Sequence, residues 1–138
     1  MNRKLLAVLA GIVTSLVFVA LIESAGHLLL GIDEAPDTHE PKALAAYVAT
    51  LPPSAFLSVL LAYIAGTFIG GWTACRVTGE NPRLYCAIVG GFMLLFAAAN
   101  FAMIPHPGWF IASSLVAISI AAWFASVVGR PEPTSTGQ

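Results

Sequence analysis

The sequence predicts an all-α integral membrane protein, a four-transmembrane-helix bundle with a short interfacial helix in its first loop. Three observations lead to this fold class. Apolar residues make up 58% of the 138 positions and charged residues 9%, against about 25% charged residues in a typical soluble protein. Four apolar segments are long enough to cross a bilayer, which takes about 20 residues each. The segments that connect them are polar and contain proline or glycine.

The first apolar segment, residues 4–30, could be mistaken for a secretory signal peptide. Its uncharged, mostly apolar run from Leu5 to Ile22 is longer than the core of a signal peptide, which is about 7–15 residues. The one position suited to cleavage, after Ala25, has Glu23 where a small residue is required. The segment is therefore predicted to be a retained transmembrane helix.

Three further segments are predicted to cross the bilayer, at residues 54–77, 82–104 and 107–128. Each begins at or beside a proline, which a first helical turn tolerates because its N–H groups have no partner within the helix. These prolines are Pro53, Pro82 and Pro107. The connections "TGEN" and "PHPG" are short, so the spans belong to one domain over residues 1–130.

The first connection, residues 31–53, is long and polar and contains a predicted short helix at residues 41–51. Apolar side chains recur there at helical spacing, and prolines stand at both ends. We expect this helix to lie at the outer interface with its apolar face toward lipid or the bundle. Residues 131–138 are polar and contain proline, which predicts a disordered cytoplasmic tail.

The basic residues predict an orientation, because cytoplasmic loops carry an excess of Lys and Arg. With the N-terminus inside, the cytoplasmic basic residues are Arg3, Lys4, Arg76, Arg83 and Arg130, and only Lys42 is outside. Both termini are thus predicted to be cytoplasmic. The compact architecture is typical of a bacterial inner (plasma) membrane. The outer loop then carries a solvated acidic cluster of Asp33, Glu34, Asp37 and Glu40.

Small residues recur at four-residue steps in the spans. Membrane helices associate through such residues because they let two backbones approach closely. The predicted packing residues are Gly11, Gly66, Gly70, Gly91, Ala117 and Ala121. The crossings they predict can lie within the monomer, between copies or against another protein.

Glu23 and His27 are the polar residues that stand out in the first span. At four-residue spacing their side chains are neighbours on one helix face. Glu23 is predicted to lie within the hydrocarbon of the outer leaflet, where a lone carboxylate costs several kcal/mol. It is therefore expected to be neutral, paired or facing a polar cavity.

Other polar residues are expected at the same outer end. Asn100 lies near the end of the third span, and Ser113 and Ser114 lie in the outer part of the fourth. With Glu23 and His27 they form the predicted ligand or proton site. His106 in "PHPG" and His39 in the acidic loop are on the same side, so Glu23, His27, His106 and His39 form a weaker set of metal candidates.

Three interpretations of this polar cluster remain open. It can be structural, with hydrogen bonds that set helix register. It can be a protonatable or ligand-binding site centred on Glu23. It can bind zinc or copper, or haem through His27 and His106, although E-x-x-x-H is a common pattern. Our first expectation is that the protein binds no cofactor, and zinc, copper and haem are weaker alternatives.

Several function classes have no support in the sequence. A net charge of −1 with no basic run does not indicate nucleic-acid binding. No hydrolase nucleophile motif, H-E-x-x-H or phosphate loop is present. Cys75 and Cys86 are predicted at the cytoplasmic side, a reducing compartment, where buried free thiols are expected rather than a disulfide. An enzyme is therefore not expected.

Three stretches, "IESAGHLLLG", "GTFIGGW" and "MIPHPGWF", resemble small four-span bacterial inner-membrane proteins without an assigned activity. The resemblance covers nearly the whole chain and implies a fold and a membrane location only. The chain is also similar to small multidrug-resistance transporters in its four short spans and its glutamate in the first helix. It departs from them because its glutamate lies near the outer end and its first loop is far longer.

We therefore expect a small interaction or accessory protein that forms a homo-oligomer or joins a larger membrane complex. A proton- or ion-coupled small transporter that uses Glu23 is the first alternative. A metal- or haem-binding protein that uses His27 and His106 is the second.

Overall fold

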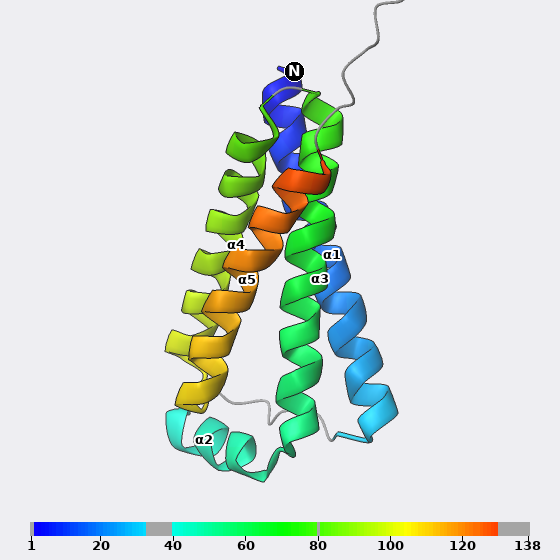
Figure 1. Cartoon of the computed structure of the whole chain (residues 1–138). Helices are drawn as coiled ribbons and strands as arrows, with labels where there is room; N and C mark the ends of the chain where they lie inside the picture. Colours follow the sequence, from blue (N-terminus) through cyan, green and yellow to red (C-terminus); the bar gives the residue numbers. More distant parts are fainter. Residues whose placement is uncertain (1, 33–39, 80, 130–138) are drawn as a thin grey trace, which may run out of the picture.

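A computed structural model of the chain describes residues 2–32, 40–79 and 81–129, and every element in these ranges is a helix (Figure 1). The helices are α1 (Arg3–Leu30), α2 (Pro41–Thr50), α3 (Pro53–Thr78), α4 (Pro82–Met103) and α5 (Gly108–Val128). Four of them, all except α2, are long and apolar enough to cross a membrane. The predicted fold class is confirmed. The predicted tail, Arg130, His39 and most of the acidic loop lie outside the described residues.

The helix ends follow from residues that can begin or stop a helix. Proline occupies the first turn of α2, α3 and α4, where its missing N–H costs nothing. Gly31 ends α1 at φ 59° and Gly79 ends α3 at φ 67°, a left-handed conformation that glycine adopts without strain. The helices differ from the ranges predicted from the sequence by no more than one residue at either end.

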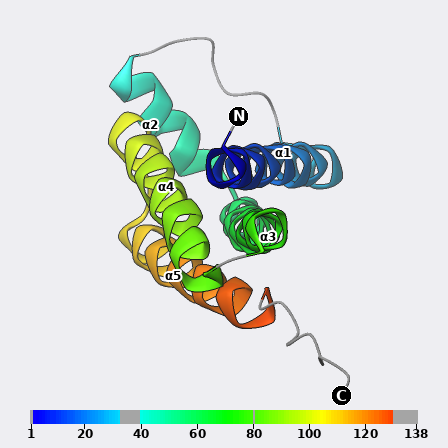
Figure 2. The ribbon, with the colours of Figure 1, turned by 90° about the horizontal axis from the view of Figure 1, so that it is seen from above.

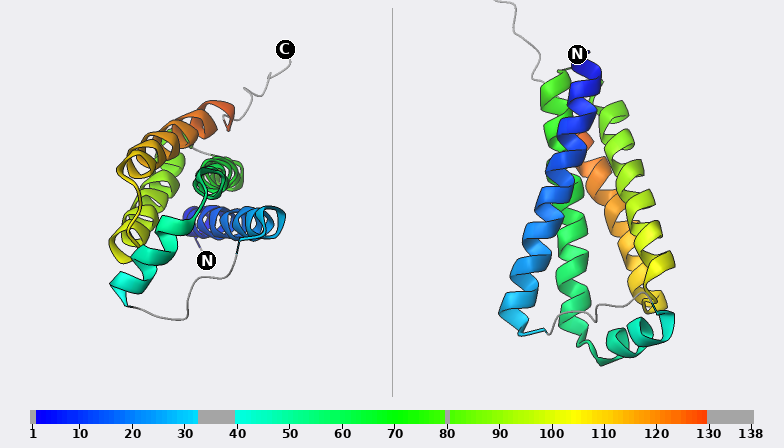
Figure 3. Two further views of the ribbon diagram at one scale, coloured as in Figure 1. Left: turned by 90° about the horizontal axis from the view of Figure 1, so that it is seen from below. Right: turned by 180° about the vertical axis from the view of Figure 1, so that it is seen from behind.

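Among the long helices α1 packs chiefly against α3, whereas α3, α4 and α5 all contact one another. Seen from above, α3 stands between α1 and α5 (Figure 2). The N-terminus of α1 lies at one end of the bundle, and α2 lies across the opposite end (Figure 1). We call these the N-terminal end and the α2 end. Toward the α2 end, α1 and α4 diverge (Figure 3), so α1 packs there chiefly against α3.

Glycines bring α1 and α3 into close contact. A Cβ atom on Gly66 would lie 2.7 Å from Val19 Cγ2 and 2.8 Å from the Ser15 carbonyl oxygen. A Cβ on Gly11 would lie 2.8 Å from Gly70 O. Because real Cβ contacts are not this short, only glycine permits this separation. The Ser15 hydroxyl, which is fully buried in this contact, donates to the Gly11 carbonyl at 3.0 Å.

The N-terminal end is closed by contacts between helix ends. The Arg3 Nε–H donates to the Val77 carbonyl at 2.9 Å, which joins the beginning of α1 to the end of α3. Between α3 and α4, the sulfur atoms of Cys75 and Cys86 are 2.7 Å apart, and both cysteines are free and buried. The Cys86 thiol also donates to the Gly71 carbonyl at 3.3 Å.

Candidate functional site

Glu23 and His27 lie on the part of α1 that diverges from α4. His27 is exposed, and its Nδ1–H donates to the Glu23 backbone carbonyl at 2.9 Å. The imidazole therefore bonds to its own helix through the carbonyl four residues earlier, not through the Glu23 carboxylate. Glu23 itself is half-buried.

The two side chains border a hollow of about 600 Å³ on the surface of the bundle. The described residues that line it are Ala20, Glu23, Ser24, His27, Leu28 and Ile32. All of them belong to α1 or to the residue after its C-cap. The hollow is therefore open sideways along one helix and is not enclosed between helices. We call Ala20, Glu23, Ser24, His27 and Leu28 the Glu23 face.

Tyr63 of α3 is the functional neighbour that sequence reasoning missed. It is buried against Phe101 of α4, with ring centroids 6.4 Å apart. The Glu23 carboxylate and the Tyr63 hydroxyl interact electrostatically across the contact of α1 with α3. Depth alone would have placed the two residues in the same part of the bundle, because at 1.5 Å per residue Glu23 and Tyr63 stand about 10 Å and about 15 Å from the α2 ends of their helices, but it would not have paired them.

The Glu23 carboxylate is not neutralised by the part of the chain that the structure describes. No described residue forms a hydrogen bond or an ion pair with its carboxylate oxygens, since His27 bonds to the backbone carbonyl instead. A carboxylate in a membrane span is stable when it is protonated, paired or hydrated. Glu23 therefore needs a proton, water or a group from outside the described residues.

Asn100, Ser113 and Ser114 form no hydrogen bond with this pair among the described residues. Ser113 donates its hydroxyl to the Trp109 carbonyl at 2.7 Å, and Ser114 is fully buried on α5. The Ser114 hydroxyl has no hydrogen-bond partner among the described residues. Asn100 is half-buried on α4. Within the described ranges no hydrogen bond links these three residues to Glu23 or His27.

His106 lies in an aromatic cluster that closes the turn between α4 and α5. Its ring stacks on Phe110 at a centroid distance of 5.3 Å and an angle of 21°. Phe101 packs against its edge at 5.3 Å, and Phe56 of α3 at 6.4 Å. Its Nδ1–H donates to the Ile104 carbonyl at 2.6 Å. Burial in this cluster lowers the pKa of His106 from its usual value of 6.5, against a smaller opposing effect of that hydrogen bond.

The metal candidates are not gathered into one site by the described residues. Among these there is no group of three or more His, Cys, Asp or Glu side chains placed to hold a metal ion. His27 is exposed on α1, whereas His106 is enclosed by side chains of α3, α4 and α5. His39 lies outside the described residues. A zinc, copper or haem site therefore stays a prediction that requires a further ligand.

The packing residues of α4 and α5 differ in their surroundings. A Cβ on Gly91 would meet nothing within 4 Å, whereas a Cβ on Gly90 would lie 2.6 Å from Ala122 Cβ. The close contact of α4 with α5 is therefore made at Gly90 and not at Gly91. On α5, Ala121 is buried and Ala117 is half-buried, and both border a hollow of about 410 Å³ beside α3.

Comparison with known proteins supplies no relative from which a role could be transferred. No protein-family model, no curated protein and no solved structure matches the chain.

Proposed function

We propose that this chain is an interaction or accessory protein of the bacterial inner membrane. Through the Glu23 face it forms a homo-oligomer or joins a larger membrane complex. Both termini are cytoplasmic, so the Glu23 face lies in the outer leaflet. The orientation is supported by the bias of basic residues toward one side.

One observation carries this proposal, the unpaired carboxylate of Glu23 on an open helix face. Nothing described in the same chain hydrogen-bonds it, although it stands in a span of the bundle. Lipid tails offer no donors, and an ionised carboxylate among them costs several kcal/mol. A donor from a second polypeptide removes this cost, and interhelical hydrogen bonds are a recognised source of affinity between membrane helices.

The surroundings of Glu23 suit the approach of another helix. Ala20 and Ser24 are small, and a small residue at four-residue spacing lets two backbones come close. Leu28 is 84% exposed. The Glu23 face therefore combines an unpaired polar group with an accessible, narrow helix surface.

Native mass spectrometry of the full chain released from lipid nanodiscs tests this proposal. We expect an oligomer or a complex with a second polypeptide in the wild type. Glu23→Gln and His27→Ala should weaken the assembly by about five- to thirtyfold, which corresponds to about 1–2 kcal/mol for an interhelical hydrogen bond. Glu40→Gln is the matched control, because it removes an exposed carboxylate before α2. Wild-type assembly in all three variants would contradict the proposal.

A proton- or ion-coupled small transporter is the second candidate, and the hollow of about 600 Å³ beside both titratable side chains favours it. Proton flux into liposomes that contain the protein distinguishes the transporter from the interaction protein. If Glu23→Gln abolishes the flux and leaves the oligomeric mass unchanged, transport is favoured. Zinc, copper or haem mass that disappears in His27→Ala would instead favour the metal alternative.

A further inference from the structure

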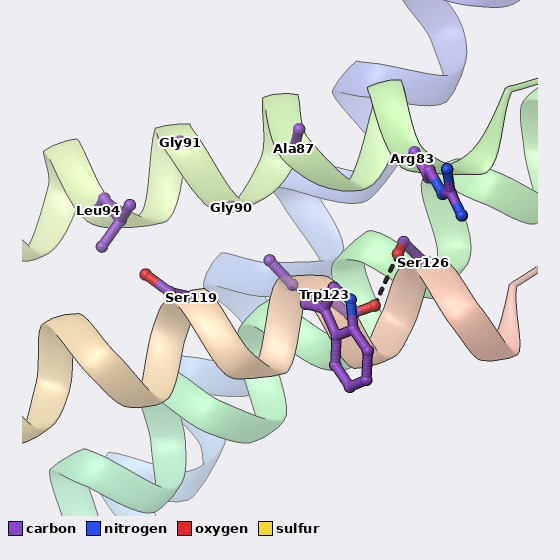
Figure 4. A pocket seen from close by; sticks show the side chains of 9 residues that line it. Arg83, Ala87, Gly90, Gly91, Leu94, Ser119, Trp123 and Ser126 are labelled. Atoms are coloured by element: carbon purple, nitrogen blue, oxygen red, sulfur yellow. Dashed lines mark hydrogen bonds between the residues drawn. The ribbon is translucent and has the colours of Figure 1, made fainter.

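A groove of about 390 Å³ runs between α4 and α5 on the surface of the bundle (Figure 4). Arg83 stands at one end of it and Leu94 at the other. Small residues line much of its length, among them Ala87, Gly91 and Ala122. None of these residues belongs to the Glu23 face, so the groove is a separate feature of the molecule.

The walls of the groove do not require a hydrogen-bonding occupant along their length. The Ser119 hydroxyl donates to the Leu115 carbonyl at 2.8 Å, and the Ser126 hydroxyl to the Trp123 carbonyl at 2.6 Å. Both hydroxyls are thus satisfied within α5, and the other lining residues beyond Arg83 are apolar or glycine, apart from the indole N–H of Trp123. An apolar chain fits this lining without leaving a hydroxyl unpaired.

The Arg83 end of the groove carries a positive charge. Arg83 is exposed, and among the residues that the structure describes none forms a hydrogen bond or an ion pair with its guanidinium. It lies in the first turn of α4, which holds no acidic residue and has no side-chain cap from Asn81. A helix N-terminus carries a partial positive charge, so the helix and the guanidinium both attract an anion at this point.

The length of the groove matches the thickness of one leaflet of a bilayer. From Arg83 to Leu94 the helix rises about 16 Å at 1.5 Å per residue. Half of a hydrocarbon core of about 30 Å is about 15 Å. We infer that the groove binds one anionic phospholipid, with its phosphate against Arg83 and an acyl chain along Gly91 toward Leu94. Basic sites between membrane helices are known to select anionic headgroups in this way.

Titration of the detergent-solubilised full chain with defined lipids, followed by native mass spectrometry, tests this inference. The probes are phosphatidylglycerol and phosphatidylcholine with identical acyl chains, and inorganic phosphate as a competitor. We expect one phosphatidylglycerol to bind about fivefold more tightly than phosphatidylcholine, since a basic residue near the membrane surface contributes about 1 kcal/mol. Inorganic phosphate at millimolar concentration should not displace it, because the acyl chain supplies the remaining affinity.

Two variants separate the headgroup contact from the chain contact. Arg83→Gln should lower phosphatidylglycerol affinity about fivefold to that of phosphatidylcholine, whereas Arg83→Lys should keep the preference. Gly91→Leu should weaken the binding of both lipids, because the new side chain enters the groove. It should not disturb the fold, since a Cβ at this position meets nothing within 4 Å. Arg76→Gln is the matched charge control, since Arg76 stacks over Trp72 on α3 outside the groove. Ala98→Leu is the matched size control on an exposed part of α4.

Three results would overturn the inference. One is an unchanged lipid preference in Arg83→Gln, or an equal loss in Arg76→Gln. Another is displacement of the lipid by inorganic phosphate, which would show an anion site without a chain. The third is a change of oligomeric mass in Gly91→Leu with lipid binding intact, which would assign the groove to a helix of a second polypeptide.

Discussion

At the scale of single residues, chemistry depends on which neighbours a side chain meets. Glu23 and His27 are adjacent on α1, yet the imidazole bonds to a backbone carbonyl, and the carboxylate lies near Tyr63 of α3 without a hydrogen bond from the described residues. His106 was grouped with them as a metal candidate on residue type and depth. The structure places it in a cluster of phenylalanine rings, where its neutral form is favoured.

His106 gives a prediction on pH. Because burial lowers the pKa of His106 in the folded state below the usual 6.5, the unfolded state takes up a proton first as the pH falls. Stability is therefore full above about pH 6.5 and decreases below it until the folded state also binds a proton. Thermal unfolding in detergent at pH 7.5 and 5.5 measures this. The decrease should be smaller in His106→Gln, which has no imidazole to take up the proton. An equal decrease in the wild type and in His106→Gln would contradict the assignment.

At the scale of elements, adjacent glycines on α4 have opposite roles. Both line the groove, but a Cβ on Gly90 would collide with Ala122 of α5, while a Cβ on Gly91 would meet no atom within 4 Å. The four-residue rows in the sequence indicate which helices can pack closely. They do not indicate the rotation of each helix about its axis, because a shift of one residue turns the contact by about 100° at 3.6 residues per turn.

The two glycines predict different effects of the same substitution. Gly90→Ala should destabilise the bundle by about 1–3 kcal/mol, because the new methyl overlaps Ala122 Cβ in a packed contact. Gly91→Ala should be neutral or stabilise by up to about 1 kcal/mol, since it meets no atom and raises helix propensity. Unfolding of both variants by denaturant in mixed micelles gives the comparison. A larger loss in Gly91→Ala than in Gly90→Ala would show that α4 is rotated differently.

At the scale of the whole molecule, the divergence of α1 from α4 distinguishes the two ends of the bundle. The N-terminal end is tied by the Arg3 contact with Val77 and by the apposed cysteines. At the α2 end, α1 depends on α3 alone among the long helices, so its Glu23 face is open. This asymmetry is the reason that the proposed partner and the proposed lipid occupy different parts of the molecule.

The orientation of the molecule is a separate prediction from the distribution of Lys and Arg. A fluorescent reporter that folds only in the cytoplasm, fused after Gln138, should be bright in bacterial cells. A periplasmic phosphatase fused at the same position should be inactive, and the same phosphatase inserted after Glu40 should be active. The reverse pattern would place the Glu23 face in the cytoplasmic leaflet and Arg83 in the outer one.

The sequence by itself determined the fold class, the number of spans and their approximate limits. These depend on apolar length against a bilayer of nearly constant thickness and on residues such as Pro53, Pro82 and Gly31 that begin or end helices. Only the tertiary structure decided that Gly90 rather than Gly91 makes the close contact with α5 and that Tyr63 of α3 lies near Glu23 of α1. It also decided that Ser113 donates its hydroxyl to its own helix, at the Trp109 carbonyl. Helix rotation, tilt and choice of neighbour come from side-chain packing between helices, and one-dimensional depth carries no information about them.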